Sequence, residues 1–311
     1  MSRGAIIASS ILGAVILVVG GMYVARNPER KTLDDAARSG APGKFVRLSD
    51  GVTQYDLSGG DTARTIVLLS GATVPYYIWD PTSTALAADG FRVLRYNYFG
   101  RGYSDRPDLR YDLATYDRQL TELLDTLRVR GRVDVAGVSL GGVIAANFAD
   151  HHPDRVRTLT LVDPAFHMFS RTPLPMRVPG LGEYVMTTTV APGMAKGQFD
   201  DFLHPERHPD WARRYEPQMQ YKGFLRSMLQ TMRGDVLTRP AASFTALAHG
   251  QTPVLIFWGR ADHTVAFAKS DSVRSAFPQA EFYAIDSAAH LPQIEQASRV
   301  NSIFLSFLRV H

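Results

Sequence analysis

The chain has 311 residues, of which 45% are hydrophobic and 21% are charged, with a formal net charge of +4 and no cysteine. This length is enough for one large globular domain, and the lack of cysteine excludes a disulfide framework. Residues 1–31 hold four cations and one acid, which leaves only +1 for the rest of the chain, and no basic stripe with interleaved aromatic residues supports nucleic-acid binding.

An uncharged run of Ile, Val, Leu, Ala and Gly occupies residues 4–25. As a helix it would span about 33 Å, and the hydrocarbon core of a bilayer is about 30 Å thick. The run exceeds the apolar region of a secretory signal peptide and lacks a small-residue cleavage site before Arg26, so we expect residues 1–31 to be a single-pass anchor with a basic flank; a signal peptide is the alternative. The cations after the run outnumber the one before it, which favours a cytoplasmic location for the rest of the chain, but export remains open. The flank would suit anionic lipid head groups.

Residues 32–43 are polar and contain Gly-Ala-Pro-Gly, which is typical of a linker. The first clearly buried strand is predicted at residues 65–69 (Thr-Ile-Val-Leu-Leu), because the run is apolar and β-prone. A turn follows it at residues 70–73 (Ser-Gly-Ala-Thr).

The most informative segment is residues 137–142 (Gly-Val-Ser-Leu-Gly-Gly), between a β-prone run at 132–136 and a helix-like run at 143–149. A strand, G-x-S-x-G and a helix in this order predict a nucleophile elbow, in which Ser139 is held at the positive end of a helix. Glycines on either side remove side chains that would clash in so sharp a turn. The alternative is an ordinary glycine-rich turn; the spacing does not fit a dinucleotide-binding fingerprint.

An acid and a histidine follow Ser139 at the ends of two further predicted strands. Asp262 comes just after the apolar run at residues 253–258, and His290 comes shortly after the short strand at 281–285. A serine hydroxyl needs a base to take its proton, and a buried carboxylate can hold that histidine in one tautomer. Asp163 also ends a predicted strand and is the alternative acid.

Residues 166–249 lose strand character and are rich in Pro, Met and aromatic residues. One helix is predicted there, because apolar residues from Tyr221 to Met232 recur on one helical face, with Gly234 at its end. Phe224 and Met228 lie on that face and are candidates for a pocket wall, although ordinary packing is the alternative. The sequence contains no spacing typical of a metal site.

These features together resemble the α/β-hydrolase superfamily, in the branch of cap-bearing serine esterases, lipases and carbon–carbon-bond hydrolases. The similarity runs from about Lys44 to the C-terminus and includes residues 100–107 (Gly-Arg-Gly-Tyr-Ser-Asp-Arg-Pro), similar to the loop after the fourth strand. It also includes residues 161–165 (Leu-Val-Asp-Pro-Ala), similar to the end of the sixth strand. The resemblance implies a mostly parallel eight-stranded sheet flanked by helices, with a core at 44–165 and 250–311 and a helical cap at 166–249.

The resemblance also implies site residues. Ser139, Asp262 and His290 would form the catalytic triad, in the chain order of this fold. The oxyanion hole would use the N–H groups of Leu140 and Ala72. Relatives usually carry His-Gly where this chain has Ser70-Gly71, which puts the geometry of that loop in doubt. We expect the substrate to border Gly71, Phe224 and Met228, and we expect no metal and no cofactor.

A serine at the elbow, where haloalkane dehalogenases and epoxide hydrolases carry aspartate, favours an acyl-enzyme route. The resemblance therefore implies a hydrolase of carboxylic esters, with a small-molecule ester as its substrate. The predicted anchor makes the membrane a second partner and, beside the apolar cap, favours hydrophobic or lipid-like esters. A carbon–carbon bond hydrolase of ring-cleavage diketones and a non-catalytic binding protein of the same fold are the alternatives. The oligomeric state remains open.

Overall fold

The computed structural model describes residues 3–311 except 167–170, 235, 238–243, 245–246 and 248–249. Within these residues, eight strands form one sheet in the order β1-β2-β4-β3-β5-β6-β7-β8. β2 pairs antiparallel with β1 and β4, and every other neighbouring pair is parallel. The predicted mostly parallel eight-stranded sheet is therefore confirmed. The strands are β1 (Lys44–Leu48), β2 (Gly51–Ser58), β3 (Thr65–Leu69), β4 (Arg92–Tyr96), β5 (Val133–Val138), β6 (Val156–Val162), β7 (Val254–Gly259) and β8 (Glu281–Ile285).

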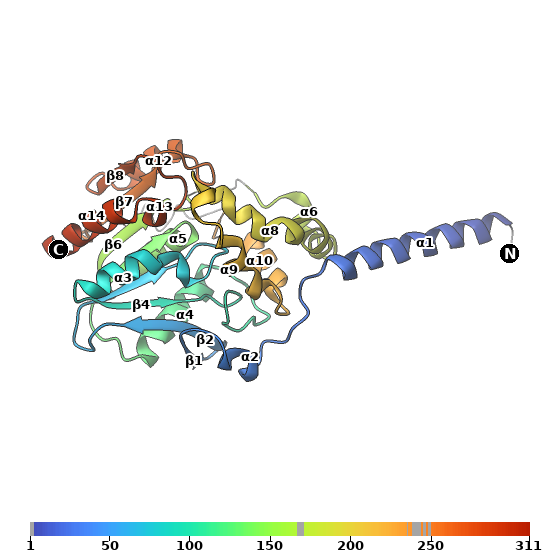
Figure 1. The fold of residues 1–311 in the computed structure, drawn as a ribbon, viewed down its shortest axis with the longest axis horizontal. Helices are drawn as coiled ribbons and strands as arrows, with labels where there is room; N and C mark the ends of the chain where they lie inside the picture. Colours follow the sequence, from blue (N-terminus) through green and yellow to red (C-terminus); the bar gives the residue numbers. More distant parts are fainter. Residues whose placement is uncertain (1–2, 167–170, 235, 238–243, 245–246, 248–249) are drawn as a thin grey trace.

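Helices cover both faces of the sheet, so the central strands are buried on both sides (Figure 1). Successive side chains of a strand point to opposite faces, and in β3 Val67 and Leu69 join one apolar cluster while Ile66 and Leu68 join the other. The first cluster includes α4 (Leu113–Thr126), α5 (Leu140–His151) and α12 (Ser270–Ala276); the second includes α3 (Asp80–Ala88) and α14 (Ala297–Val310). Shorter elements are η1 (Tyr76–Trp79), η2 (Pro153–Arg155), η6 (Phe267–Lys269) and α13 (Pro292–Glu295).

The strands predicted from continuous apolar runs lie within a residue or two of their expected bounds. β3 and β8 have the predicted limits, β5 covers 133–138 where 132–136 was expected, and β7 covers 254–259 where 253–258 was expected. All residues of β3, β5 and β7 are buried, which is why an unbroken apolar run rather than an alternating pattern marked them.

The chain between β6 and β7 contains the predicted cap, built of short helices beside the carboxyl ends of the strands (Figure 1). The helix expected from Tyr221 begins at Phe224, because Gly223 before it has a left-handed φ of 91°, and it ends at Arg233 just before Gly234. Residues 167–170 and 248–249, near the expected cap boundaries, lie outside the described residues. The cap elements are α6 (Leu174–Arg177), α7 (Leu181–Val185), the π-helix η3 (Met186–Val190), α8 (Ala191–Gly197), η4 (Gln198–Asp201), η5 (Pro205–Arg207), α9 (Trp211–Met219) and α10 (Phe224–Arg233).

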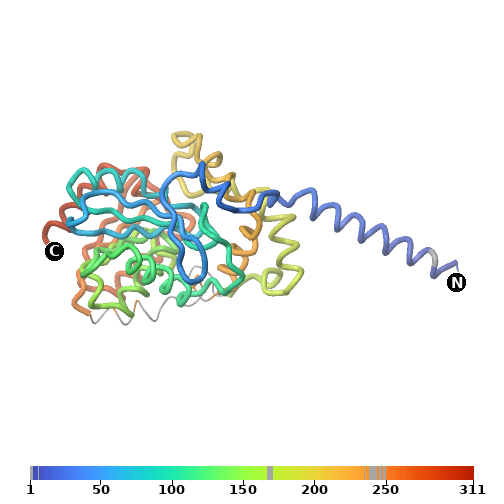
Figure 2. The backbone as a smooth tube through the Cα atoms, turned by 90° about the horizontal axis from the view of Figure 1, so that it is seen from below, coloured from blue at the N-terminus to red at the C-terminus, as the bar shows by residue number. Residues whose placement is uncertain are grey.

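The N-terminal helix α1 (Arg3–Arg26) projects away from the body of the protein and starts at the end opposite the C-terminus (Figures 1 and 2). It is long and apolar enough to cross a membrane, with a mean hydropathy of 2.4 over its most apolar window and none of that window buried. Residues 1–2 of the expected anchor lie outside the described residues. The expected linker holds one short helix, α2 (Asp35–Ser39).

Candidate active site

Ser139 lies where β5 ends and α5 begins, with φ 55° and ψ −119°. A residue other than glycine in this conformation is strained, and such strain persists only where the surroundings fix the backbone. Here the Ser139 N–H donates to the Val162 carbonyl at 2.9 Å, and the Ser139 carbonyl accepts from the N–H groups of Gly142 and Ala165, both at 3.0 Å. The backbone therefore holds the serine in a sharp turn between strand and helix.

The two glycines that flank the serine are required by the close approach of other backbone segments. A Cβ on Gly137 would lie 2.1 Å from the Gly141 carbonyl oxygen, and a Cβ on Gly141 would lie 2.3 Å from the Leu69 carbonyl oxygen. No side chain fits at either position. The G-x-S-x-G pattern in the sequence thus has a direct steric cause in the structure.

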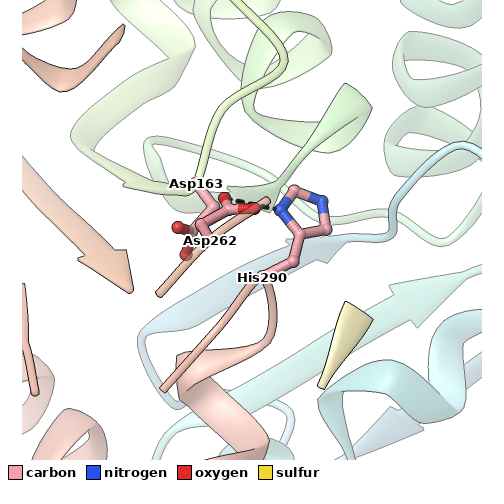
Figure 3. Close-up of side chains that lie close together, drawn as sticks. All are labelled: Asp163, Asp262 and His290. Atoms are coloured by element: carbon pink, nitrogen blue, oxygen red, sulfur yellow. Dashed lines mark hydrogen bonds and ion pairs between the residues drawn. The ribbon is translucent and has the colours of Figure 1, made fainter. Parts of the chain in front are cut away.

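Asp262 and His290 are brought together after β7 and β8 (Figure 3). His290 Nδ1 lies 2.8 Å from Asp262 Oδ2, while Asp262 Oδ1 accepts the N–H groups of Thr264 at 2.8 Å and Val265 at 2.9 Å. Both side chains are buried. The carboxylate is thus fixed by three donors. Where His290 Nδ1 donates to it, the neutral imidazole carries its free lone pair on Nε2.

The surroundings of His290 raise its pKa above the ordinary value of 6.5. Burial opposes protonation of the ring, but the charge and hydrogen bond of Asp262, together with the charge of Asp201, outweigh that effect. Asp201 belongs to the cap, and its carbonyl accepts the His290 backbone N–H at 3.0 Å. Burial in turn raises the pKa of the Asp201 carboxyl.

Ser139 shares the carboxyl edge of the sheet with this pair, since β5, β7 and β8 are parallel members of one sheet. Among the hydrogen bonds of the described residues, none joins the Ser139 hydroxyl to His290. Such a bond is often long in the absence of substrate and tightens only in the complex. The structure therefore brings two of the three predicted residues into contact and places the third at the same edge.

Asp163, the alternative acid, lies beside Asp262 but does not take its place. It is fully buried, its Oδ1 accepts the Gly259 N–H at 2.9 Å, and the ligand atoms of Asp163, Asp262 and His290 all lie within 4.8 Å of one another (Figure 3). Burial, and then the Asp262 carboxylate, raise the pKa of Asp163 well above its usual range. These atoms are close enough to ligate a cation, but both oxygens of Asp262 already accept N–H donors, so the set fits a hydrogen-bonded acid–base pair better.

The loop after β3 approaches the turn at Ser139. A Cβ on Gly71 would lie 3.6 Å from Ser139 Cβ, and Ala72 follows directly. Leu140 is the first residue of α5, where a backbone N–H has no acceptor within the helix. The two predicted donor residues therefore lie on the segments that border Ser139, although Ser70 replaces the usual histidine.

Arg101 lies between the loop after β3 and the cap and binds both. Its guanidinium is 1% exposed and donates from Nε to the Ala72 carbonyl at 2.5 Å. It also donates from Nη1 to Ser227 Oγ at 3.3 Å and from Nη2 to Thr231 Oγ1 at 2.9 Å, both on α10. One buried side chain therefore ties the loop after β3 to the cap.

Phe224 and Met228 are buried in an apolar cluster that includes other cap residues such as Met186 and Tyr215. These contacts are those of cap packing, so a contact of either side chain with a substrate stays a prediction.

Sequence reasoning missed Asp201 and Glu295. The Glu295 carboxylate accepts the Ala289 N–H at 2.7 Å with one oxygen and the Leu203 N–H at 2.8 Å with the other, so it joins the His290 loop to the cap. Asp201 has no local sequence signal, because it contacts His290 from a distant part of the chain. Glu295 is near His290 in sequence, but its bond to Leu203 joins residues 92 positions apart.

Comparison with known proteins shows the family to which the chain belongs. The alpha/beta hydrolase family profile matches residues 66–303, so the chain belongs to this family. It is 28% identical over 86% of its length to a 2-hydroxy-6-oxononadienedioate/2-hydroxy-6-oxononatrienedioate hydrolase of Paraburkholderia phymatum, of which 96% is covered. It is 27% identical over 89% of its length to the dihydrolipoyllysine-residue acetyltransferase component of the acetoin cleaving system of Pseudomonas putida, of which 72% is covered.

Among solved structures, a thermophilic esterase from Thermogutta terrifontis has a TM-score of 0.71 and 22% identity, with 86% of this chain and 98% of that chain covered. At that identity the likeness shows the fold alone. The protein is therefore a hydrolase of the α/β-hydrolase fold, with relatives that include a carbon–carbon bond hydrolase.

Proposed function

We propose that the protein is a membrane-anchored serine hydrolase that cleaves hydrophobic carboxylic esters. The observation that carries this proposal is the buried Asp262–His290 hydrogen bond at the same sheet edge as the strained Ser139 turn. An oriented base, a serine at a helix N-terminus and two bordering backbone segments are the parts that acyl transfer requires.

The proposed reaction has two halves. His290 Nε2 takes the proton of the Ser139 hydroxyl as its oxygen attacks the ester carbonyl, and Asp262 stabilises the imidazolium. The Leu140 and Ala72 N–H groups bind the oxyanion, each donor lowering the barrier by about 3 kcal/mol. His290 then gives its proton to the departing alcohol, which leaves an ester on Ser139. Water, deprotonated by His290, attacks that ester, and collapse returns the serine hydroxyl and releases the acid.

The hydrophobic substrate class is supported by α1 and by the cap. A helix of this length and apolarity, none of whose most apolar window is buried, fits a bilayer core. The cap packs Met176, Met186, Met219 and Met228 with aromatic residues, and methionine adapts readily to irregular apolar groups. An enzyme held at a membrane meets water-poor esters at high local concentration.

A fluorophosphonate probe tests the nucleophile, because it reacts with activated serines. We expect the full chain to be labelled and Ser139→Ala to be unlabelled, with Ser275→Ala, an exposed serine in α12, as the matched control. Wild type without labelling would favour the non-catalytic binding protein, and labelling that persists in Ser139→Ala would show that the wrong serine was chosen.

The second candidate is hydrolysis of a carbon–carbon bond in a ring-cleavage diketone, which the Paraburkholderia phymatum relative supports. The same triad would serve it. Turnover of p-nitrophenyl esters of increasing chain length, measured beside turnover of a vinylogous diketone, separates the two. Diketone turnover that exceeds ester turnover would replace the ester proposal.

A further inference from the structure

The cap carries an unusual concentration of exposed apolar side chains. Outside α1, the described part of the chain exposes five large hydrophobic residues, and three of them fall within eight residues of one another: Leu174 (64% exposed), Val178 (41%) and Leu181 (47%). We call these three residues the apolar edge. Exposed apolar side chains grouped in this way mark a contact surface more often than isolated ones do.

The backbone of the apolar edge is held in place. Met176, between Leu174 and Val178, is buried, and its carbonyl accepts Arg233 Nε at 2.6 Å. Arg233 Nη1 also pairs with the Glu183 carboxylate at 2.7 Å, just after Leu181. The exposed side chains are therefore presented by a fixed segment.

The same part of the cap holds the base of α1. The rings of Tyr23 and Tyr184 stack with their centroids 6.3 Å apart, and Arg26 Nη1 donates to the Thr188 carbonyl at 2.7 Å. Tyr184 belongs to α7, the helix that begins with Leu181. The apolar edge and the base of α1 are thus on adjoining parts of the cap, at the end of the molecule from which α1 projects (Figures 1 and 2).

The chain that follows α1 is bound along the turn between α9 and α10. The Arg30 and Lys31 N–H groups donate to the Gln220 carbonyl at 2.9 and 2.8 Å, and the Lys31 carbonyl accepts from Lys222 at 2.9 Å. The Glu29 carboxylate accepts the Leu225 N–H, near the start of α10, at 2.7 Å. These bonds fix the angle between α1 and the cap, whereas an unbound linker would allow the rest of the protein to rotate relative to α1.

Resting on the anchoring in the proposed function, we infer that the cap lies against the membrane and that the apolar edge inserts among the head groups of an anionic leaflet. Tyrosine is typical of the membrane–water boundary, which is where Tyr23 and Tyr184 would lie. Exposed cations at the same end, Arg30, Lys31 and Arg177, suit anionic head groups. The cap thus faces the lipid, and the opposite end of the core faces water.

Single cysteines test this geometry, because the natural chain has none. The full chain is reconstituted into phosphatidylcholine–phosphatidylglycerol vesicles, with an environment-sensitive fluorophore on Leu174→Cys or Val178→Cys and quenching bromines on the lipid chains. Val15→Cys in α1 is the control for anchoring, and Ser272→Cys, exposed on α12, is the control for water. We expect quenching at 15, 174 and 178, and none at 272.

The outcomes separate the two proposals. Quenching at 15 without quenching at 174 and 178 leaves the anchor in place and overturns the inference. No quenching at 15 overturns the anchoring, and the inference falls with it. A blue-shifted emission at 174 and 178 without lipid quenching shows that protein covers the apolar edge, which also overturns the inference.

Activity gives a second test. The double change Leu174→Asp and Val178→Asp should lower turnover of a vesicle-dissolved long-chain ester about tenfold, the effect of losing roughly one buried aliphatic side chain. Turnover of a soluble short ester should not change. Val310→Asp, 77% exposed at the other end of the molecule, should change neither. Equal turnover of the vesicle-dissolved ester by the double variant and wild type would refute a lipid contact at this edge.

Discussion

Replacement of Asp163 by asparagine tests whether the Asp163 carboxyl, buried beside the Asp262 carboxylate, is protonated in the folded protein. Burial, and then the Asp262 carboxylate, raise the pKa of Asp163 well above its ordinary value of 3.8. In the folded protein the carboxyl stays protonated at pH values where it ionises in the unfolded chain. The unfolded state then binds fewer protons, so the contribution of Asp163 to stability is lost as the pH rises from about 4 toward the folded-state pKa, by about 1.4 kcal/mol per pH unit.

Asparagine is neutral at every pH and nearly the same size. Its amide oxygen can accept the Gly259 N–H as Asp163 Oδ1 does at 2.9 Å, and its amide group can donate to Asp262. We therefore expect Asp163→Asn to gain stability relative to wild type as the pH rises above about 4, until the pH reaches the folded-state pKa of Asp163.

Urea unfolding of the full chain in mild detergent, followed by tryptophan fluorescence at pH 5, 6 and 7, measures this difference. Asp154→Asn changes an exposed acid and is the matched control, with a difference from wild type that should not vary with pH. A pH-independent difference for Asp163→Asn would show that Asp163 is ionised in the folded protein, and the reasoning would be wrong.

Three further predictions concern the pH profile, the elbow and the loop after β3. Burial opposes protonation of His290, but nearby carboxylates outweigh it and raise the pKa of this histidine. The acid limb of kcat/KM for a soluble ester should therefore lie above pH 6.5, and Asp201→Asn should move that limb to lower pH. Gly141→Ala places a Cβ 2.3 Å from a carbonyl oxygen and should cost about 1–3 kcal/mol of stability. Gly193→Ala, whose Cβ meets nothing within 4 Å, should cost none, and thermal unfolding midpoints compare the two variants. Arg101→Met should lower kcat about tenfold with little change in KM, because the Ala72 carbonyl loses its buried donor and the proposed oxyanion donor at Ala72 is no longer held in place. Steady-state kinetics measure both constants.

Local sequence was sufficient for the parts of the fold that short-range chemistry dictates. β3 and β7 are buried on both faces, so each had to be a continuous apolar run. The turn at Ser139 needs glycines on both sides, so it left a pattern of fixed spacing. α10 was predictable as a helix because one of its faces packs into an apolar cluster.

The contacts that complete the site could not be predicted in this way. Asp201 and Glu295 are two of 30 acidic residues. Nothing near Asp201 in sequence indicates that it reaches His290, and nothing near Glu295 indicates that it binds Leu203 of the cap. Asp163 was recognised as an acid at a strand end. Burial, and then the Asp262 carboxylate, raise its pKa, and the closeness of the two acids depends on β6 and β7 lying side by side. The apolarity of α1 was evident, whereas its attachment to the cap depends on carbonyl groups that any residue can supply.

Glu295 shows how the cap and the base depend on each other. Its two oxygens bind N–H donors of Ala289 and Leu203, so Glu295→Gln turns one acceptor into a donor that faces another donor. We expect a loss of about 1–3 kcal/mol of stability, from the N–H left unpaired, and a lower kcat/KM for a soluble ester. The acid limb of the pH profile should stay in place, because Glu295 is not among the groups that set the pKa of His290, whereas Asp201→Asn should move it. Glu216→Gln, which changes an exposed acid on α9, is the control. If Glu295→Gln shifts the acid limb or keeps full activity, the carboxylate does not act by holding the His290 loop to the cap.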